Sequence, residues 1–224
     1  MQIVPARAFE PQASCPPLIR DEIHLWFLTA ATIDDSRKAI AIETRKALTR
    51  LLVLYGDTDS PPPLDHGPYG KPFLPDSNGI EFNLSHCGRS ALIAFARGQS
   101  LGVDLECLDR RQRFEDIADR YFTPEEARGL RNLPEERHVD AFLRLWTCKE
   151  AVLKALGVGL SFGLDRLSFK PDEEGKPDML ASIAPEGGVA ADWQIVALTP
   201  AEGLVGAIAW QGPPLGIRAM RWSA

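Results

Sequence analysis

The sequence predicts an α+β protein built as a pseudo-two-fold pair of similar subdomains, each a helix packed on a small antiparallel sheet. Its 224 residues, 45% of them hydrophobic, supply ample core for one globular unit or two small joined ones. Each half contains a helical segment that ends in leucine-rich sequence and glycine, RLLVLYG and AVLKALG. These observations place one subdomain at 1–105 and the other at 106–224.

Local signals define the first elements. Residues 1–20 are rich in proline and predict an irregular arm. Residues 22–30 predict a strand with an apolar end. Residues 33–56 predict a helix, because an aspartate can cap its start, apolar residues recur at helical spacing and Gly56 can end it.

The remaining segments alternate between turns, strands and helices. Residues 57–79 are dense in turn residues and predict a long surface loop. Three short apolar runs within 80–108 predict an antiparallel meander. Residues 109–133 predict helical pieces that break at prolines, and 135–157 give the strongest helical pattern. Residues 164–224 predict short strands and turns.

A weak internal repeat supports the paired arrangement. Gly98 aligns with Gly212, an offset of 114 residues, and three further positions match at the same offset: Leu101 with Leu215, Gly102 with Gly216, and Val103 with Ile217. At this offset Asp104 and Glu106 fall opposite Arg218 and Met220. Because only one copy carries the acids, the repeat predicts one site.

Composition excludes several classes of protein. No run of about 18 apolar residues is present, which argues against a membrane span. The N-terminus lacks the pattern of a secretory signal, and the four scattered cysteines form no metal spacing, so we expect a reduced cytoplasmic protein. The net charge of −6 disfavours nucleic acid and anionic membranes as partners.

The pentapeptide GVDLE, residues 102–106, carries the first chemical signal. Asp104 and Glu106 lie at i and i+2 of a predicted strand and therefore share one face. An ordinary solvated strand face explains this pair. A bound divalent cation also explains it, because adjacent carboxylates repel and oxygen ligands suit Mg²⁺ or Mn²⁺.

A third acid lies on the predicted helix. Glu150 falls on the apolar stripe of Phe142 and Trp146, where a carboxylate needs a partner. Lys154 at i+4 offers a simple intrahelical ion pair. If the helix packs on the meander, Glu150 instead reaches the two strand acids, and Lys154 lies where it can hold an anion on the metal. Mg²⁺ commonly recruits substrate phosphates, so this arrangement predicts chemistry at a phosphate.

Four motifs occur in a family-specific order: GKPFLP (70–75), FNLSHCG (82–88), GVDLE (102–106) and WTCKEAVLK (146–154). In this order the chain resembles the 4'-phosphopantetheinyl transferases of the surfactin-synthetase-activating type, in the subgroup with the WxxKEA pattern. The resemblance covers about residues 70–163. It implies a fused pseudo-dimer, which gives the internal repeat a reason, and it implies a monomer.

The resemblance also implies a reaction. The phosphopantetheine arm of coenzyme A moves to a serine of an apo acyl, peptidyl or polyketide carrier protein, and adenosine 3',5'-bisphosphate leaves. Asp104, Glu106 and Glu150 are then the ligands of Mg²⁺, and Lys154 contacts the phosphates. The nucleotide end of coenzyme A is implied to contact a further set of residues: Arg45, Lys71, Ser85 and His86.

The proton acceptor for the serine stays open at this stage between Glu150, directly or through water, and Glu126. Two departures from the family pattern occur. The basic segment before the first helix is reduced to Arg37 and Lys38, and Cys87 stands where many relatives have serine. We expect residues 109–113 and Arg120 to face the carrier protein through local basic charge.

Two rival functions are weighed against this one. Clustered acids with lysine also occur in metal-dependent nucleases and phosphohydrolases, but the PD-(D/E)xK pattern needs lysine where Leu108 stands. A non-catalytic interaction module would bind no metal and would tolerate loss of Asp104 or Glu150.

Overall fold

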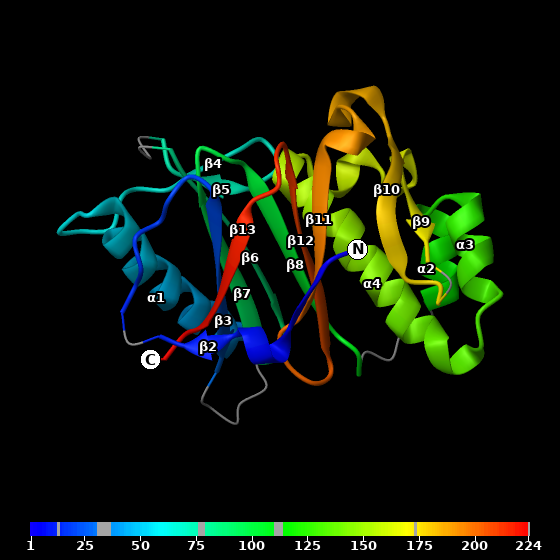
Figure 1. Cartoon of the computed structure of the whole chain (residues 1–224), viewed down its shortest axis with the longest axis horizontal. Coiled ribbons are helices and arrows are strands. Elements are labelled where there is room, and N and C mark those ends of the chain that lie inside the picture. Colours follow the sequence, from blue (N-terminus) through cyan, green and yellow to red (C-terminus); the bar gives the residue numbers. More distant parts are fainter. Residues whose placement is uncertain (13, 31–36, 76–78, 110–113, 173, 224) are drawn as a thin grey trace.

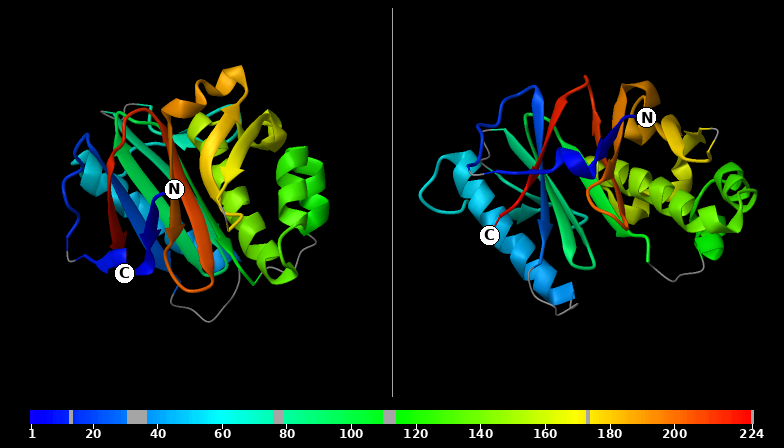
Figure 2. Two further views of the ribbon diagram at one scale, coloured as in Figure 1. Left: turned by 45° about the vertical axis from the view of Figure 1, so that its right-hand side comes forward. Right: turned by 60° about the horizontal axis from the view of Figure 1, so that its bottom comes forward.

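The molecule is layered in the order helix, sheet, sheet, helix (Figures 1 and 2). The computed structural model describes residues 1–12, 14–30, 37–75, 79–109, 114–172 and 174–223. Within these ranges no helix combines the length and the apolar character that crossing a membrane requires. The arrangement confirms the predicted α+β class.

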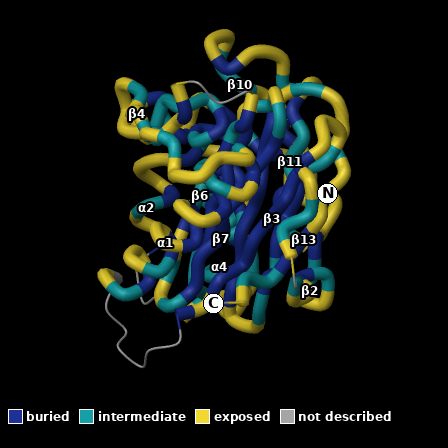
Figure 3. Tube along the Cα trace, turned by 90° about the vertical axis from the view of Figure 1, so that its left-hand side faces the viewer, coloured by how far each residue is buried: buried dark blue, intermediate teal, exposed yellow. Residues whose placement is uncertain are grey.

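The first sheet has five strands and is covered on its outer face by α1 (Arg37–Gly56). Its strands, in spatial order, are β2 (Glu10–Pro11), β13 (Gly216–Arg221), β3 (Glu22–Thr29), β7 (Ser90–Arg97) and β6 (Ile80–Cys87). Strands β3 and β7 are buried along almost their whole length (Figure 3).

The second sheet has four strands and is covered by α4 (Glu135–Leu156). Its strands, in spatial order, are β1 (Ile3–Pro5), β11 (Trp193–Thr199), β12 (Leu204–Gln211) and β8 (Leu101–Cys107). At the end of this half lie two short helices and a hairpin: α2 (Phe114–Tyr121), α3 (Pro124–Arg131), β9 (Leu167–Pro171) and β10 (Pro177–Ile183).

Minor elements complete the chain. A two-residue ladder joins β4 (Asp65–His66) to β5 (Pro72–Phe73), so the predicted loop at 57–79 contains a small hairpin. Single-turn 3₁₀ helices occupy Ala6–Ala8, Gly159–Phe162, Leu164–Arg166, Pro185–Gly187 and Ala190–Asp192. The predicted irregular arm is partly regular, because β1 and β2 pair with β11 and β13.

The predicted meander is wrong at its third strand. β6 and β7 form an antiparallel hairpin, but β8 leaves them and pairs antiparallel with β12 in the second sheet. In the same way β13 follows β12 in sequence but pairs in parallel with β3 in the first sheet. Each half therefore gives its last strand to the other half's sheet, and the predicted boundary at residue 105 falls inside β8.

Apolar clusters fill the spaces between the layers. Between the sheets, side chains of β3 and β7 meet those of β8, β11 and β12. A second cluster joins α1 to the outer face of the first sheet, and a third joins α4 to the second sheet and to α2, α3 and the β9–β10 hairpin. The alternation along β8 matters most: Val103 and Leu105 face the inter-sheet core, so Asp104 faces α4.

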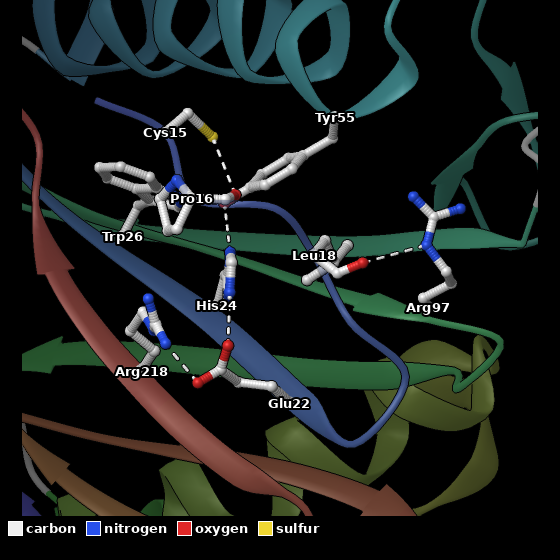
Figure 4. Close-up of polar contacts among 9 residues, drawn as sticks. All are labelled: Cys15, Pro16, Leu18, Glu22, His24, Trp26, Tyr55, Arg97 and Arg218. Atoms are coloured by element: carbon white, nitrogen blue, oxygen red, sulfur yellow. Dashed lines mark hydrogen bonds and ion pairs between the residues drawn. The ribbon is translucent and has the colours of Figure 1, made fainter.

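A buried polar chain ties α1 to the first sheet (Figure 4). His24 on β3 is fully buried; its Nδ1 lies 2.7 Å from the Tyr55 hydroxyl at the end of α1, and its Nε2 lies 2.9 Å from Glu22. Trp26 donates its indole N–H to the same hydroxyl, and Arg218 pairs with Glu22 at 3.1 Å. These contacts are mutually consistent for a neutral His24 that accepts from Tyr55 and donates to Glu22.

Candidate metal and phosphate site

Side chains of β6 hold the free edge of β8 at the point where the two sheets meet. Asn83 accepts the backbone N–H of Val103 at 2.9 Å, and Ser85 accepts that of Leu105 at 3.3 Å. Cys87 accepts the backbone N–H of Cys107 at 3.1 Å. The polar residues at every second position of FNLSHC thus satisfy backbone donors that no neighbouring strand reaches.

Glycine at position 102 lets α4 lie directly on β8. A Cβ built on Gly102 would stand 2.1 Å from the Ala151 carbonyl oxygen and 2.3 Å from the Ala155 nitrogen, so no other residue fits without moving the helix. Gly102 and Asp104 lie at i and i+2 and share the face toward α4. This close approach brings the helix acid toward the strand acids.

The helix lysine binds the first strand acid. Lys154 Nζ lies 2.7 Å from Asp104 Oδ1 and 3.1 Å from the Val103 carbonyl oxygen. The Ser85 hydroxyl donates to the same carboxylate oxygen at 2.9 Å. The other oxygen of Asp104 is buried and has no hydrogen-bond partner. Lys154 therefore neutralises Asp104 across the helix–strand contact, and its ion pair is with Asp104 and not the intrahelical pair with Glu150 considered from the sequence.

Glu150 lies in the field of both strand acids. Its Oε1 is buried without a hydrogen-bond partner. Burial raises the pKa of Glu150 to about 7, and the charges of Asp104 and Glu106 add to this rise while Lys154 opposes it. Near neutral pH the protonated and ionised forms of Glu150 are therefore both populated. This suits a group that exchanges a proton for a cation, or that accepts a proton.

The donor set fits a hard divalent cation. Among the described residues, no three His, Cys, Asp or Glu side chains are arranged so that they could hold a metal ion by themselves. Mg²⁺ does not need such a group, because it commonly takes one or two carboxylates and completes its shell with water and substrate phosphates. The unsatisfied buried oxygens of Asp104 and Glu150 are the kind of atom that such an ion binds.

Glu126 has a structural setting. Its two oxygens accept four hydrogen bonds or ion-pair contacts: from the Phe169 N–H at 2.8 Å, from the Thr123 N–H and hydroxyl, and from Lys149 at 2.7 Å. Thr123 and Glu126 form a capping box at the start of α3. With its acceptors used in this way and its side chain buried, Glu126 is held as a structural carboxylate.

The partner of Glu126 is equally buried. Lys149 has no exposed surface and also donates to the carbonyl oxygens of Leu164 and Leu167, at 2.8 and 2.5 Å. Burial lowers the pKa of Lys149, and Glu126 counteracts this. The residue next to Glu150 in sequence thus points away from the acids and fixes α3, α4 and the start of β9 to one another.

A large cavity lies apart from these acids. It has a volume of about 610 Å³ and lies between α3 and the β9–β10 hairpin, with Leu130, Leu145 and Phe169 among its walls. Glu126 lines it, but Asp104, Glu106 and Glu150 do not. The cavity and the three acids therefore lie in different parts of the molecule.

Lys71, in the GKP loop, reaches the beginning of β8. Its ammonium donates to the Leu101 carbonyl oxygen at 3.1 Å and lies 3.3 Å from both the Ser100 hydroxyl and the Ala155 carbonyl oxygen. Asp104 lies three positions further along the strand than Leu101, so Lys71 contacts β8 about 10 Å from that acid. Burial lowers its pKa.

Ser85 and His86 point to opposite faces of β6, because successive side chains alternate along a strand. Ser85 is buried and supports Asp104, whereas His86 is exposed and shares the α1 face with Phe82 and Leu84. Arg45 is exposed on α1. The structure thus brings Ser85 to the acids and leaves His86 and Arg45 on the other face of the first sheet.

Trp146 is half-buried and packs against the core. Its ring lies 5.8 Å from that of Phe142 and 6.3 Å from that of Phe122, centroid to centroid. On the surface expected to meet a carrier protein, Asp109 and Arg120 are exposed, and Arg120 lies over the ring of Tyr121. Residues 110–113 lie outside the described part of the chain.

Sequence reasoning missed two supports of this site. The role of Gly102 was hidden, because a close helix–strand approach is visible only once α4 is placed. The second support is the set of hydrogen bonds that β8 makes to Asn83, Ser85 and Cys87. The sequence does carry a signal for it, because polar residues stand at every second position of an otherwise apolar strand.

Comparison with known proteins places the chain among related sequences. Residues 100–206 match the 4'-phosphopantetheinyl transferase superfamily. The chain is 32% identical over 223 residues to the 4'-phosphopantetheinyl transferase HetI of Nostoc sp., with 87% of this chain and 90% of that protein covered. It is 36% identical over 108 residues to the 4'-phosphopantetheinyl transferase Sfp of Bacillus subtilis, covering 48% and 47%. A further match is the L-aminoadipate-semialdehyde dehydrogenase-phosphopantetheinyl transferase of Xenopus laevis, at 35% over 112 residues, covering 45% and 37%.

Proposed function

The chain belongs to the 4'-phosphopantetheinyl transferase superfamily, and from this premise we propose that it is a Mg²⁺-dependent holo-carrier-protein synthase. It transfers the phosphopantetheine arm of coenzyme A to a serine hydroxyl of an apo carrier protein and releases adenosine 3',5'-bisphosphate. The observation that supports this proposal is electrostatic: the charges of Asp104 and Glu106 on β8 both raise the pKa of Glu150 on α4.

The acids and the lysine have separate roles in this proposal. Asp104, Glu106 and Glu150 hold the ion, which when bound offsets negative charge on the pyrophosphate of coenzyme A. Lys154 lies beside Asp104, so phosphate oxygens bound to an ion on these acids would lie close enough for its ammonium to contact them. The ammonium then stabilises the leaving phosphate, where negative charge increases during transfer.

We assign the proton acceptor to Glu150, acting directly or through water. A base works best when its pKa lies near the working pH, and that of Glu150 is about 7 in the metal-free protein; a bound cation lowers it. Glu126 is disfavoured because its acceptors are occupied by Phe169, Thr123 and Lys149. The serine proton thus moves to a carboxylate that already borders the reacting phosphate.

Binding of the nucleotide end is proposed for the residues that the family pattern marks. Lys71 holds the loop next to the beginning of β8, and Ser85 orients Asp104. His86 and Arg45, both on the α1 side of the first sheet, are available for the ribose phosphate. We further propose that the protein acts as a cytoplasmic monomer, with halves 1–105 and 106–224 forming one site, and that it binds no nucleic acid.

The direct test is transfer itself. Purified protein is incubated with coenzyme A, Mg²⁺ and several apo carrier proteins, and the mass of each carrier is measured. The expected result is one phosphopantetheine group on the carrier serine, lost when EDTA replaces Mg²⁺. No adduct on any carrier would refute the proposal, and nicking of plasmid DNA by the same preparation would favour the nuclease alternative.

Two matched variants separate the candidate bases. Glu150→Gln should abolish transfer, whereas Glu126→Gln should retain the turnover of the folded fraction, because its carboxylate only supports the capping box and Lys149. Circular dichroism gives the folded fraction of each variant. Loss of turnover in fully folded Glu126→Gln protein would return the base to Glu126.

A further inference from the structure

Two cysteines lie side by side where β6 and β8 end. Cys87 is the last residue of β6 and Cys107 the last residue of β8. The Cys107 N–H donates to Cys87 Sγ at 3.1 Å, and a hydrogen bond joins the two thiol side chains. Both residues are partly exposed and present as thiols. A small oxidant can therefore reach two thiols that already contact each other.

The geometry is compatible with a covalent link. With 3.1 Å between Cys107 N and Cys87 Sγ, ordinary bond lengths limit the distance between the two Cα atoms to about 7 Å, close to the upper end of the range that disulfides span. Cys107 Sγ also lies 3.2 Å from where a Cβ on Gly88 would stand, so the residue after Cys87 puts no side chain against that sulfur.

One thiol of the pair contacts a proposed metal ligand. Cys87 Sγ donates to Glu106 Oε2 at 3.5 Å, and Cys107 follows Glu106 in the chain. Groups that orient a metal ligand commonly affect affinity or activity by about 10- to 100-fold when they are removed. A change at either sulfur therefore acts on Glu106 at once, through a lost donor and through the backbone of β8.

We propose that Cys87 and Cys107 form a reversible disulfide that inactivates the enzyme by displacing Glu106. A peroxide is the oxidant. One thiol attacks a peroxide oxygen, which gives a sulfenic acid and releases water; the second thiol displaces the sulfenic hydroxyl as water and closes the S–S bond. Each peroxide takes two electrons from the thiol pair and leaves as two waters. A dithiol reductant reverses the reaction.

The other two cysteines serve as internal controls. Cys148 is only 1% exposed, whereas Cys87 and Cys107 are half-buried, so access to peroxide separates them. Thiol acidity does not, because burial raises the pKa of Cys148 to about 12 and the Cys107 side chain and burial raise that of Cys87 as well. Cys15 lies in the N-terminal arm beside Tyr55, on the α1 side of the first sheet. Peroxide should therefore link Cys87 to Cys107 before it alters Cys148, and any reaction of Cys15 should leave the site unaffected.

The chemical half of the proposal is tested by mass spectrometry on the full chain. After peroxide treatment the intact mass should fall by about 2 Da, two of the four thiols should become unreactive, and a peptide linking Cys87 to Cys107 should appear. Dithiothreitol should restore the original mass. Absence of this linked peptide, or a link that involves Cys15 or Cys148 instead, overturns the proposal.

The effect on the site rests on the proposed function and needs its own readout. Oxidation should lower transfer to the carrier by at least about 10-fold and should abolish the rise in melting temperature that Mg²⁺ gives the reduced protein. Cys107→Ser and Cys87→Ser should resist peroxide, and Cys15→Ser should remain sensitive. Equal sensitivity of Cys107→Ser refutes the switch. If peroxide forms the disulfide but the reduced protein never modifies a carrier, the proposed function is refuted instead.

Discussion

Replacing Glu150 by glutamine should stabilise the metal-free protein while it removes activity. The wild-type carboxyl is buried beside Asp104 and Glu106, and its Oε1 has no hydrogen-bond partner. Ionising it inside the fold is therefore unfavourable. Glutamine keeps the shape of the side chain and removes the charge, so the penalty disappears together with the two roles proposed for the carboxylate, as cation ligand and as proton acceptor.

The size of the effect follows from the pKa. An ordinary glutamate ionises at 4.5, and Glu150 ionises at about 7 in the folded protein. Each pKa unit corresponds to roughly 1.4 kcal/mol, which gives an upper value of about 3 kcal/mol. Because the folded pKa is raised, the folded protein binds more protons between these values. The stabilising contribution is thus complete below pH 4.5 and is lost as pH rises through 7.

Guanidinium unfolding followed by tryptophan fluorescence, in EDTA, measures this directly. At pH 5 the two proteins should unfold at similar denaturant concentrations; at pH 8 Glu150→Gln should be more stable by about 2–3 kcal/mol. Adding Mg²⁺ at pH 8 should stabilise only the wild type.

Asp104→Asn is the matched control with the opposite expected sign. It removes the counter-ion of Lys154, so it should destabilise the protein at pH 8 by about 1–3 kcal/mol. If Glu150→Gln differs from the wild type by the same amount at pH 5 and pH 8, or is the less stable protein at pH 8, Glu150 is not held in the field of the other acids.

Three further perturbations test the supports of the fold. Gly102→Ala should push α4 away from β8 and lower the free energy of unfolding by about 1–3 kcal/mol in chemical denaturation. Gly216→Ala should be tolerated, because a Cβ at this equivalent repeat position would stand 3.5 Å from its nearest neighbour. Equal effects of the two substitutions would contradict the close approach of α4 to β8. Lys149→Met should cost about 3–5 kcal/mol, and adding Glu126→Gln should recover part of it; a neutral single variant would show that the ion pair contributes nothing. Burial lowers the pKa of His24, so the folded state disfavours its charged form and the stability of the protein should fall as the pH decreases below 6.5. Thermal unfolding at pH 7 and pH 5 measures this fall. An equal fall in His24→Gln would assign it to other groups.

The sequence predicted best where the signal is local. The helix at 135–157 matches α4, because Pro134 precedes its first residue, its stripe is apolar and Gly157 adopts the left-handed conformation that ends it. The inward position of Glu150 followed from the same periodicity. Both depend on residues within a few turns of one another, which is the range over which sequence patterns act.

Non-local choices were not predictable in this way. Nothing in GVDLE tells whether β8 pairs with β7 or with β12, since both neighbours are apolar strands of similar length. The partner of Lys154 depended on the same choice, because Asp104 becomes available only once α4 lies on β8. Glu126 was ambiguous for another reason: a carboxylate three residues after Thr123 fits both a capping box and a base.

The exchange of β8 and β13 makes the two halves dependent on each other. A chain cut between β8 and α2 would yield an N-terminal fragment whose β8 has lost β12, and a C-terminal fragment whose β13 has lost β3. Neither piece could complete its own sheet, yet mixing them should restore both by fragment complementation. A polypeptide in which only one half has folded should therefore lack both completed sheets.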